Sequence, residues 1–430
     1  MDIRIEPGPL NGTVQAIASK SELHRMLICA AFADRPTELS VSGSPYDGCH
    51  ELPNDIQATI HCLQALGAEF EVLPGLIHVM PTDHSSKPEA PLLDCGESGS
   101  TFRFLLPVAA AFSGHATFSG SGRLPERPIT DLADALEKHG VSFSSRILPF
   151  TIQGKPNGGR YEIPGNISSQ YLTGLLLMLP LLEEEAQIHL TTALVSSGYI
   201  DITTHIMEDF GVHVSCAGNI WELYERKTYT SPHHLHVGGD WSNAAAFLTA
   251  SMLRKDQFVI CQSLLPDSPQ GDRKIISLLE AFGAETTVTG DSILMKSGSL
   301  HGTTVDIDET PDLLPVLAVA ACAAQGTTHF TNAARLRLKE SDRIESVAGL
   351  IRDLGGTVET SPDSLTVHGT GTLRGGTVNA ANDHRIVMAA AIAASLCEAP
   401  VIIHGAEAVN KSYPTFFEDF AAVKGAAHVL

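Results

Sequence analysis

The chain has 430 residues, more than one hydrophobic core usually supports, so we expect two domains. A formal charge of -21 argues against a nucleic-acid or anionic-membrane partner, because both require a basic face. Apolar runs are interrupted well before 18 residues, which argues against a membrane span. The opening MDIRIEPGPLNGTV has the pattern of neither a secretory signal nor a transit peptide, so we expect a cytoplasmic protein.

A helix-like stretch that ends in glycine and leads into an extended stretch occurs six times along the chain. The glycines recur at intervals of 70 to 73 residues: Gly67, Gly140, Gly211, Gly283, Gly355 and Gly425. Each occupies the position where a helix commonly ends in a residue with positive φ. The spacing predicts six units of about 72 residues.

A second feature recurs in phase with the first, namely a polar opening followed by an unusually apolar stretch. These openings begin at residues 19, 98, 168, 242, 310 and 382. Helices that are apolar nearly all round are buried helices. Each unit is therefore predicted to wrap strands and an amphipathic helix around a buried helix, which is an α/β arrangement.

The simplest interpretation of the Ser, Asp and Asn residues at these openings is helix capping. Capping does not explain why cations gather in the first turns, where the helix dipole disfavours them. These are Lys20, Arg25, Arg103, His384 and Arg385. An anion held between the cations and the helix ends would explain the pattern, and two groups of three helix ends could converge on one site.

The opening CGESGST at 95–101 combines glycine and hydroxyl residues ahead of a helix. It lacks the lysine that a nucleotide-binding loop places on the outer phosphates, so ATP binding is not indicated. The loop suits a smaller anion, such as a carboxylate or a single phosphate. Eight cysteines without CxxC pairs indicate reduced thiols, and neither a disulfide nor a metal site is expected.

Basic residues also occur outside the helix openings. Arg123 and Arg127 flank prolines in RLPERPITDL, a rigid loop that could aim a guanidinium, although a solvated loop arginine is the simpler interpretation. Alternating charges in RLRLKESDR, from 335 to 343, are usually a surface run, but their place after GTTHFTN predicts a strand end that carries some of them into a site.

Several motifs together resemble the 5-enolpyruvylshikimate-3-phosphate (EPSP) synthase family. They are LDCGESGSTFRFLLP, RPITDL, ISSQYLTGLL, SSGYIDIT, GDWSNAAAFL, PDLLPVLAV, RLRLKESDRI, NDHRIVMA and VNKSYPTFF. The resemblance implies a two-domain inverse α/β barrel-like fold of six units, three per domain. It places the domains at 19–237 and at 1–18 plus 238–430, with the active site in the interdomain cleft.

By the same resemblance, the reaction moves the enolpyruvyl group of phosphoenolpyruvate to the 5-hydroxyl of shikimate-3-phosphate and releases phosphate. No cofactor and no metal is implied, and we expect a monomer. The residues implied for shikimate-3-phosphate are Lys20, Ser21, Arg25, Ser168, Ser169, Gln170, Ser196, Asp312, Asn332 and Lys339. Those implied for phosphoenolpyruvate are Lys20, Gly99, Arg127, Gln170, Arg343, Arg385 and Lys411.

Three residues are candidates for proton transfer. Asp312 would deprotonate the 5-hydroxyl, and Glu340 and Lys20 would exchange a proton with the methylene carbon. From the residues alone, Asp312 could equally be a helix N-cap and Glu340 an ion-pair partner of Lys339 or Arg343.

The chain departs from the family pattern at a few positions. Glu97 and Phe104 leave the response to glyphosate open, and the segment 42–55, with Asn54 and Asp55, has no assigned role. One alternative is the UDP-N-acetylglucosamine enolpyruvyl transferase, whose reactive cysteine has no counterpart in GRLPERPI. Another is a phosphometabolite-binding protein without catalysis, and a purely structural repeat protein is the least favoured.

Overall fold

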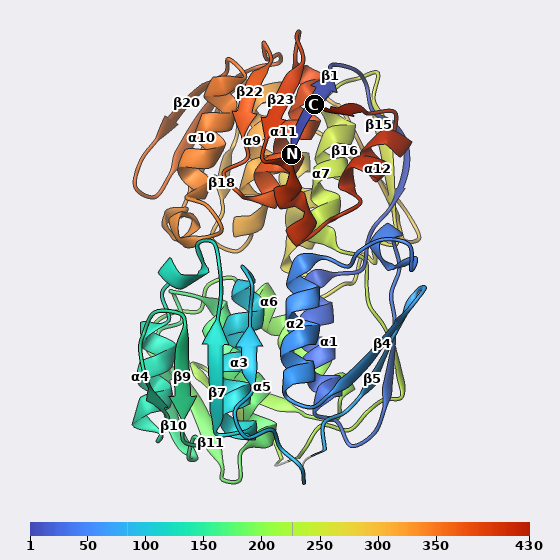
Figure 1. Cartoon of the computed structure of the whole chain (residues 1–430). Helices are drawn as coiled ribbons and strands as arrows, with labels where there is room; N and C mark the ends of the chain where they lie inside the picture. The colour runs from blue at the N-terminus through green and yellow to red at the C-terminus, as the bar shows by residue number, and fades with distance from the viewer. Residues whose placement is uncertain (84, 226) are drawn as a thin grey trace. The chain divides into compact units, whose positions relative to one another are not determined.

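The computed structural model describes residues 1–83, 85–225 and 227–430. The chain divides into two units (Figure 1). Unit 1 comprises Met1–Ala18, Ser42–Pro45 and Gly238–Leu430, and unit 2 comprises Ser19–Val41 and Tyr46–Val237. The first 18 residues therefore fold with the second half of the chain.

The described part of unit 2 contains three four-stranded sheets. In spatial order, the first is β14 (His234–His236), β3 (Thr37–Ser40), β5 (Leu76–Met80) and β4 (Glu69–Leu73). The second is β6 (Leu92–Asp94), β7 (His115–Ser119), β9 (Phe150–Gln153) and β8 (Ser142–Phe143). The third is β10 (Gly159–Ile163), β11 (Ala186–Leu190), β13 (Ile220–Leu223) and β12 (Val214–Ala217).

Unit 1 also has three four-stranded sheets among its described residues. The first is β16 (Glu285–Thr289), β17 (Ser292–Lys296), β15 (Phe258–Gln262) and β2 (Asn11–Gln15). The second is β18 (Thr304–Asp306), β19 (Gln325–Thr331), β21 (Leu365–Thr370) and β20 (Thr357–Thr360). The third is β22 (Gly376–Asn379), β23 (Val401–His404), β1 (Asp2–Glu6) and β24 (Ala426–Val429).

Each of these sheets has one parallel pair at one edge and two antiparallel pairs. A parallel pair needs a long crossover, and in four sheets that crossover carries a helix. The other two sheets exchange their first strands. β2 precedes α1 (Lys20–Ala31) but pairs with β15, whereas β14 precedes α7 (Trp241–Met252) but pairs with β3. An antiparallel bridge joins Ala18 to Gly239 where these two segments pass.

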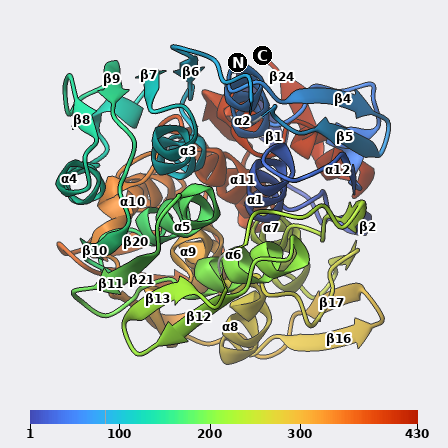
Figure 2. The same cartoon turned by 90° about the horizontal axis from the view of Figure 1, so that it is seen from below.

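Six apolar helices are buried along nearly their whole length, as their composition predicts. They are α1, α3 (Gly99–Phe112) and α5 (Ser169–Met178) in unit 2, and α7, α9 (Leu314–Ala323) and α11 (His384–Ala393) in unit 1. Figures 1 and 2 show α3 beside α5, and in unit 1 α9 packs against both α7 and α11. These helices form the cores on which the sheets pack.

The remaining helices bury one face. They are α2 (Asn54–Ala65), α4 (Thr130–Lys138), α6 (Gly198–Asp209), α8 (Ile275–Ala281), α10 (Arg343–Asp353) and α12 (Phe416–Ala422). The mixed α/β fold class predicted from the sequence is confirmed by this architecture and by the solved structures compared below.

Two local predictions were wrong. Five of the six landmark glycines have positive φ, but at the last landmark the left-handed residue is Lys424, with φ of 68°. Gly425 serves a close approach instead, because a Cβ there would lie 2.7 Å from the carbonyl oxygen of Phe420 and against its ring. The alternating stretch RLRLK is also not a strand end. Its first four residues lie in the 3-10 helix η6 (Ala334–Leu338), in which Arg335 pairs with Asp308 at 2.9 Å.

Candidate active site

The N-terminal ends of three buried elements meet in unit 1. Arg385, in the first turn of α11, donates to the carbonyl oxygen of Ser242 at 3.3 Å and to Asp312 Oδ2 at 3.3 Å. Ser242 lies in the first turn of α7, and Asp312 lies in η5 (Pro311–Leu313), which leads directly into α9. Helix N-termini favour negative charge, so this arrangement favours an anion.

Asp312 is the centre of a cluster of charged side chains in unit 1. Lys339 Nζ lies 3.4 Å from Asp312 Oδ1, and the Arg343 guanidinium also donates to that oxygen. Burial of Asp312 favours its neutral form, but Arg385, Lys339 and Arg343 outweigh burial and hold the pKa of this carboxyl well below its usual range. Asp312 is thus a carboxylate, and it does not cap α9, whose N-cap residue is Leu313.

Arg343 is fully buried and binds three carboxylates. Its Nε donates to Asp383 Oδ2 at 2.8 Å, one NH2 group donates to Glu340 at 2.6 Å, and the other donates to Asp312. Burial alone would lower the pKa of Arg343, but Asp383, Glu340 and Asp312 raise it well above the ordinary value. The interpretation of Glu340 as an ion-pair partner of Arg343 therefore holds in this structure.

Asp383 is a member of this cluster that the sequence analysis did not single out. It is completely buried, caps α11 by accepting from Arg385 N at 3.0 Å, and accepts from Ser341 Oγ at 3.1 Å. Its place in the motif NDHR, just before the predicted buried helix, was a signal for the cap. Nothing in the sequence indicated that the same carboxylate also holds Arg343.

Two other predicted residues of unit 1, Lys411 and Asn332, contact different parts of that unit. Lys411 ends η8 (Ala406–Lys411), and its Nζ donates at 2.7 Å to the carbonyl oxygen of Asn382, two residues before α11. Lys411 is therefore at the N-terminal end of α11, close to Arg385. Asn332 follows β19 with φ of 58° and donates to Asp306 at 2.9 Å, and its side chain makes no described contact with the Asp312 cluster.

Helix N-termini also meet in unit 2. Lys20, the first residue of α1, forms an ion pair of 2.7 Å with Asp55 in the first turn of α2. The hydroxyls of Thr59 and Thr101 each donate to the Asp55 carbonyl oxygen at 3.3 Å, which ties α2 to the first turn of α3. Asp55 belongs to the segment that had no assigned role in the sequence, and the structure makes it the partner of Lys20.

Gln170 connects α5 to α3. Its Oε1 accepts from Arg103 at 2.7 Å, and its Nε2 donates to Ser100 Oγ at 3.1 Å. Ser168 caps α5 by accepting from Gln170 N, and Ser169 is the first residue of that helix. Arg103 is buried and also donates to Pro128 O at 3.0 Å, so it holds Gln170 and the loop of 123–128 at once.

Gly99 and Arg127 are brought together. Arg127 is buried just after η2 (Leu124–Glu126), and a Cβ on Gly99 would lie 2.8 Å from Arg127 Cζ and closer still to a terminal nitrogen. The absence of a side chain at Gly99 therefore makes room for the guanidinium. Arg123, by contrast, is 40% exposed and faces Glu126.

Arg25 is held by groups of its own unit. It donates to Thr203 Oγ1 at 2.7 Å, to Tyr199 O at 3.1 Å and to Ser21 O at 2.5 Å, and it lies 4.8 Å from the centre of the Phe104 ring. Burial lowers the pKa of Arg25 to about 10. Ser196, buried ahead of α6 with φ of 53°, is in the same part of unit 2.

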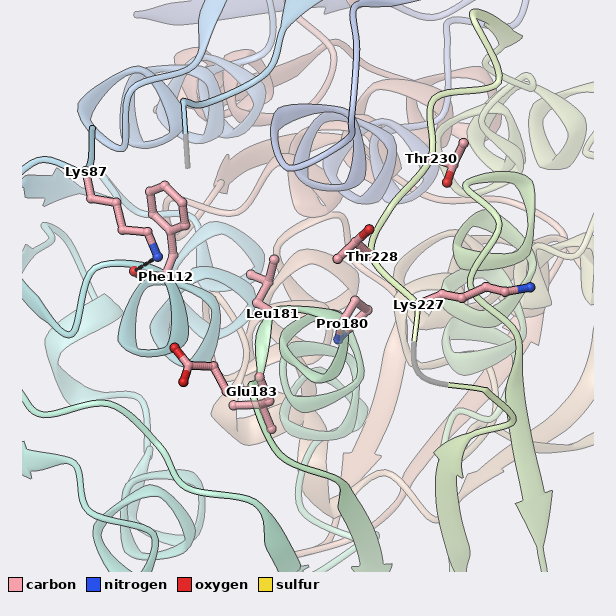
Figure 3. Close-up of a pocket in the computed structure, with 9 residues that line it drawn as sticks. Lys87, Phe112, Pro180, Leu181, Glu183, Lys227, Thr228 and Thr230 are labelled. Atoms are coloured by element: carbon pink, nitrogen blue, oxygen red, sulfur yellow. Dashed lines mark hydrogen bonds between the residues drawn. The ribbon is translucent and has the colours of Figure 1, made fainter. Parts of the chain in front are cut away.

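A cavity of about 780 Å³ lies elsewhere in unit 2 and contains none of the predicted site residues. It is lined by Lys87, Phe112, Pro180, Leu181, Leu182, Glu183, Lys227, Thr228 and Thr230. Figure 3 shows Lys87 reaching the carbonyl oxygen of Phe112, 3.0 Å away, at the C-terminal end of α3. A helix C-terminus disfavours anions, so this cavity does not share the electrostatics of the other end of α3.

Other classes of site are not found in the part of the chain that the structure describes. No group of three or more His, Cys, Asp or Glu side chains there could hold a metal ion. No described helix is long and apolar enough to cross a membrane. The eight cysteines are free, and six of them are buried.

A family model for EPSP synthase (3-phosphoshikimate 1-carboxyvinyltransferase) matches residues 5–420 of the chain. The chain belongs to the EPSP synthase family. Curated 3-phosphoshikimate 1-carboxyvinyltransferases of Clostridium novyi and Clostridium kluyveri are 37% and 36% identical to it. The alignments cover 99% and 98% of this chain and 98% and 97% of those proteins.

Solved structures share the EPSP synthase fold. The EPSP synthase of Acinetobacter baumannii is 24% identical, with a TM-score of 0.80 over 100% of both chains. The enolpyruvyl transferase NikO of Streptomyces tendae is 17% identical, with a TM-score of 0.76 over 99% of this chain and 98% of that one. The family resemblance of the motifs is thereby confirmed, as is the two-domain α/β fold.

Proposed function

We propose that this protein transfers the enolpyruvyl group of phosphoenolpyruvate to the 5-hydroxyl of shikimate-3-phosphate, a step of aromatic amino-acid biosynthesis through the shikimate pathway. Family membership supports the reaction. The observation that carries the proposal is the Asp312 carboxylate, held among Lys339, Arg343 and Arg385 at helix N-termini. The chain is acidic overall, yet three cationic side chains cluster around Asp312 in unit 1. Two anionic substrates would require such a cluster of positive charge.

Each substrate would be bound by residues of both clusters, and Lys20 and Gln170 would contact both substrates. We assign phosphoenolpyruvate to Lys20, Gly99, Arg127, Gln170, Arg343, Arg385 and Lys411. We assign shikimate-3-phosphate to Lys20, Ser21, Arg25, Ser168, Ser169, Gln170, Ser196, Asp312, Asn332 and Lys339. The assignment requires residues 19–237 and residues 1–18 plus 238–430 to act as two domains on one substrate pair, in a cleft between them. No metal or cofactor takes part in it.

Chemically, the reaction is an addition followed by an elimination. The 5-hydroxyl oxygen bonds to C2 of phosphoenolpyruvate while C3 gains a proton, which gives a tetrahedral intermediate. C3 then loses a proton as the bond from C2 to the phosphate oxygen breaks, and phosphate leaves. The protein must therefore remove a proton from oxygen and move one to and from carbon, while cations stabilise the growing charge.

Asp312 is suited to accept the hydroxyl proton because it is ionised. Its three cations, which lower its pKa, also make it a weak base while no substrate is bound. Substrate anions that engage Arg385 and Lys339 would weaken their hold on Asp312 and raise its pKa. Basicity would then increase only when both substrates are in place, and Glu340 and Lys20 would serve the methylene carbon.

Asp55 is expected to act only through Lys20. We predict that Asp55→Asn slows phosphate release about tenfold, because Lys20 loses the ion pair that orients it, and that Lys20→Met slows it by at least 10²-fold. The double variant should be no slower than Lys20→Met alone. Steady-state phosphate release by all three variants measures this, and an additive loss in the double variant would contradict it.

Gly99→Ala is predicted to raise the KM for phosphoenolpyruvate by about tenfold with a smaller change in the KM for shikimate-3-phosphate. The new methyl group would displace the Arg127 guanidinium, which lies against Gly99. A loss of one charge-assisted contact is about 1.5–3 kcal/mol. Gly349→Ala, on α10, makes the same change where φ is not positive and a Cβ meets nothing within 4 Å, so it displaces no neighbour. Equal KM values in the two variants would refute the steric argument.

The test of the proposed function is phosphate release from phosphoenolpyruvate by purified protein, with shikimate-3-phosphate or UDP-N-acetylglucosamine as acceptor. We expect turnover with shikimate-3-phosphate alone, lost in Lys20→Met. Turnover with the sugar nucleotide would assign the protein to the sister activity. Binding of both substrates without turnover would make it a phosphometabolite-binding protein. Sedimentation would check the expected monomer.

A further inference from the structure

Asp272 is a buried carboxyl group that the proposed mechanism does not use. It lies in η4 (Gly271–Lys274), ahead of α8, and only 5% of its surface is exposed. Its Oδ1 has no hydrogen-bond partner among the described residues. A buried carboxylate with an open oxygen is costly, so this group needs an explanation.

The position of Asp272 is fixed by its neighbour Gln270. The side chain of Gln270 accepts from Trp241 N at 3.0 Å and donates to Gly239 O at 2.8 Å. Both partners belong to the start of α7, so η4 is attached to the N-terminal end of that helix. The Asp272 carboxyl is thereby held beside Ser242, whose carbonyl oxygen accepts from Arg385.

Asp272 belongs to a group of charged side chains near the N-terminal end of α7. The charges that act on Asp272 are those of Asp312 in η5, Arg385 in the first turn of α11 and Asp240 at the N-cap of α7. In its own turn, Arg273 donates to the Pro266 carbonyl oxygen. A further anion bound at Arg385 would disfavour the ionised form of Asp272, because like charges in a buried site repel one another.

Asp272 is the carboxyl of this group with the weakest support for a negative charge. Asp312 has Lys339 and Arg343 in addition to Arg385. Asp240 accepts from Asn243 N at 2.7 Å as the cap of α7. The Ser242 hydroxyl lies beside Asp272, and the positive charge of Arg385 acts on Asp272 and on Asp312 alike. It is therefore the group that a proton would occupy first.

We propose that Asp272 is a positioning residue for Arg385, which takes up a proton when the anionic donor binds at Arg385 and releases it when the anion leaves. This inference rests on the proposed function, in which Arg385 binds phosphoenolpyruvate. An ionised Asp272 competes with the incoming anion for Arg385, and the proton removes that competition. Binding of the donor is thus coupled to the uptake of one proton by Asp272.

The electrostatics of the cluster agree with this role. Burial, and next the negative charge of Asp312, raise the pKa of Asp272 to about 6, although Arg385 opposes the shift. A bound anion would raise it further. Donor affinity would then fall with rising pH above about 6, by up to about tenfold per pH unit while one proton is taken up.

The test compares wild-type protein with Asp272→Asn, which keeps the shape and cannot titrate, and with Asp267→Asn, which makes the same charge change at an exposed residue of the same loop. The KM for phosphoenolpyruvate is measured from pH 6 to pH 8.5 at saturating shikimate-3-phosphate. We expect the ratio of wild-type KM to Asp272→Asn KM to rise by up to about tenfold per pH unit above pH 6, with kcat within about threefold. The donor's own titration cancels in this ratio.

Asp267→Asn should follow the wild-type profile, and Asp272→Glu should retain the pH dependence even if Asp272→Asn fails to fold. Parallel KM profiles for wild type and Asp272→Asn would overturn the proposal. A wild-type protein without turnover would overturn the proposed function instead. In that case, thermal unfolding at several pH values would test whether Asp272 titrates as proposed.

The pKa of Asp272 fixes the direction in which stability should change with pH. The folded-state pKa of Asp272 lies above its unfolded value of 3.8, so the stability it contributes is full below about pH 4 and is lost as pH rises through about 6. The unfolding midpoint of Asp272→Asn relative to wild type should therefore increase from pH 4.5 to pH 7 and then stay constant. A difference that does not change with pH would overturn the proposal.

Discussion

Asp312→Asn is expected to lower kcat for phosphate release by about 10²–10⁴-fold, the usual contribution of a general base. The amide keeps the size of the carboxyl and can still accept from Arg343, but it cannot take the hydroxyl proton. Affinity for phosphoenolpyruvate should change less than kcat, because Arg343 retains its bonds to Asp383 and Glu340. Steady-state kinetics with each substrate varied separates the two effects.

A matched control for Asp312→Asn is Asp291→Asn, which makes the same change at an exposed turn between β16 and β17. It should behave as the wild type. If Asp312→Asn kept kcat within tenfold of the wild type, another group would have to be the base, and Glu340 would be the first to examine.

Arg343→Met is expected to destabilise unit 1 by about 3–5 kcal/mol, because it leaves a buried carboxylate without its partner. Asp383 has no exposed surface on its side chain, and it bonds the Arg343 Nε at 2.8 Å. Asp312 and Glu340 lose a donor as well. Urea unfolding followed by circular dichroism would report the loss as a lower midpoint.

Arg352→Met removes an exposed arginine from the last turn of the same helix, α10, and should cost less than about 1 kcal/mol. Arg343→Lys should fall between the two, since it keeps the charge but cannot reach three carboxylates at once. An Arg343→Met protein that unfolds at the wild-type urea concentration would show that Asp383 is satisfied by its other partners.

The features that the sequence predicted best are those set by local chemistry. The apolar runs led to six buried helices, and Ser19, Ser98, Ser168 and Asp383 cap helices where the polar openings indicated. The motifs also identified the family, because their order extends over nearly the whole chain. Helix caps and buried helices depend on neighbouring residues alone.

The features that the sequence did not predict depend on distant residues. Asp55 reaches Lys20 across 35 positions, and Asp383 reaches Arg343 across 40. Nothing in either short segment distinguishes such a carboxylate from a helix cap. The charges of RLRLK were misread for the same reason, since Asp308, on a different segment, fixes Arg335 in a 3-10 turn and not in a strand.

The exchange of strands between the two sheets has a consequence for the order of folding during synthesis. Unit 2 has all its described strands once β14 is made, near residue 236. β1 and β2 are made first, yet β2 waits for residues 258–262 and β1 for residues 401–404 and 426–429. The nascent chain thus carries two unpaired strands until residues 258–262 are made, and β1 stays unpaired, with Ile3 and Ile5 uncovered, until residues 401–404 are made. Unpaired edges invite mispairing, so the N-terminal segment is where a holding chaperone would have most effect on yield.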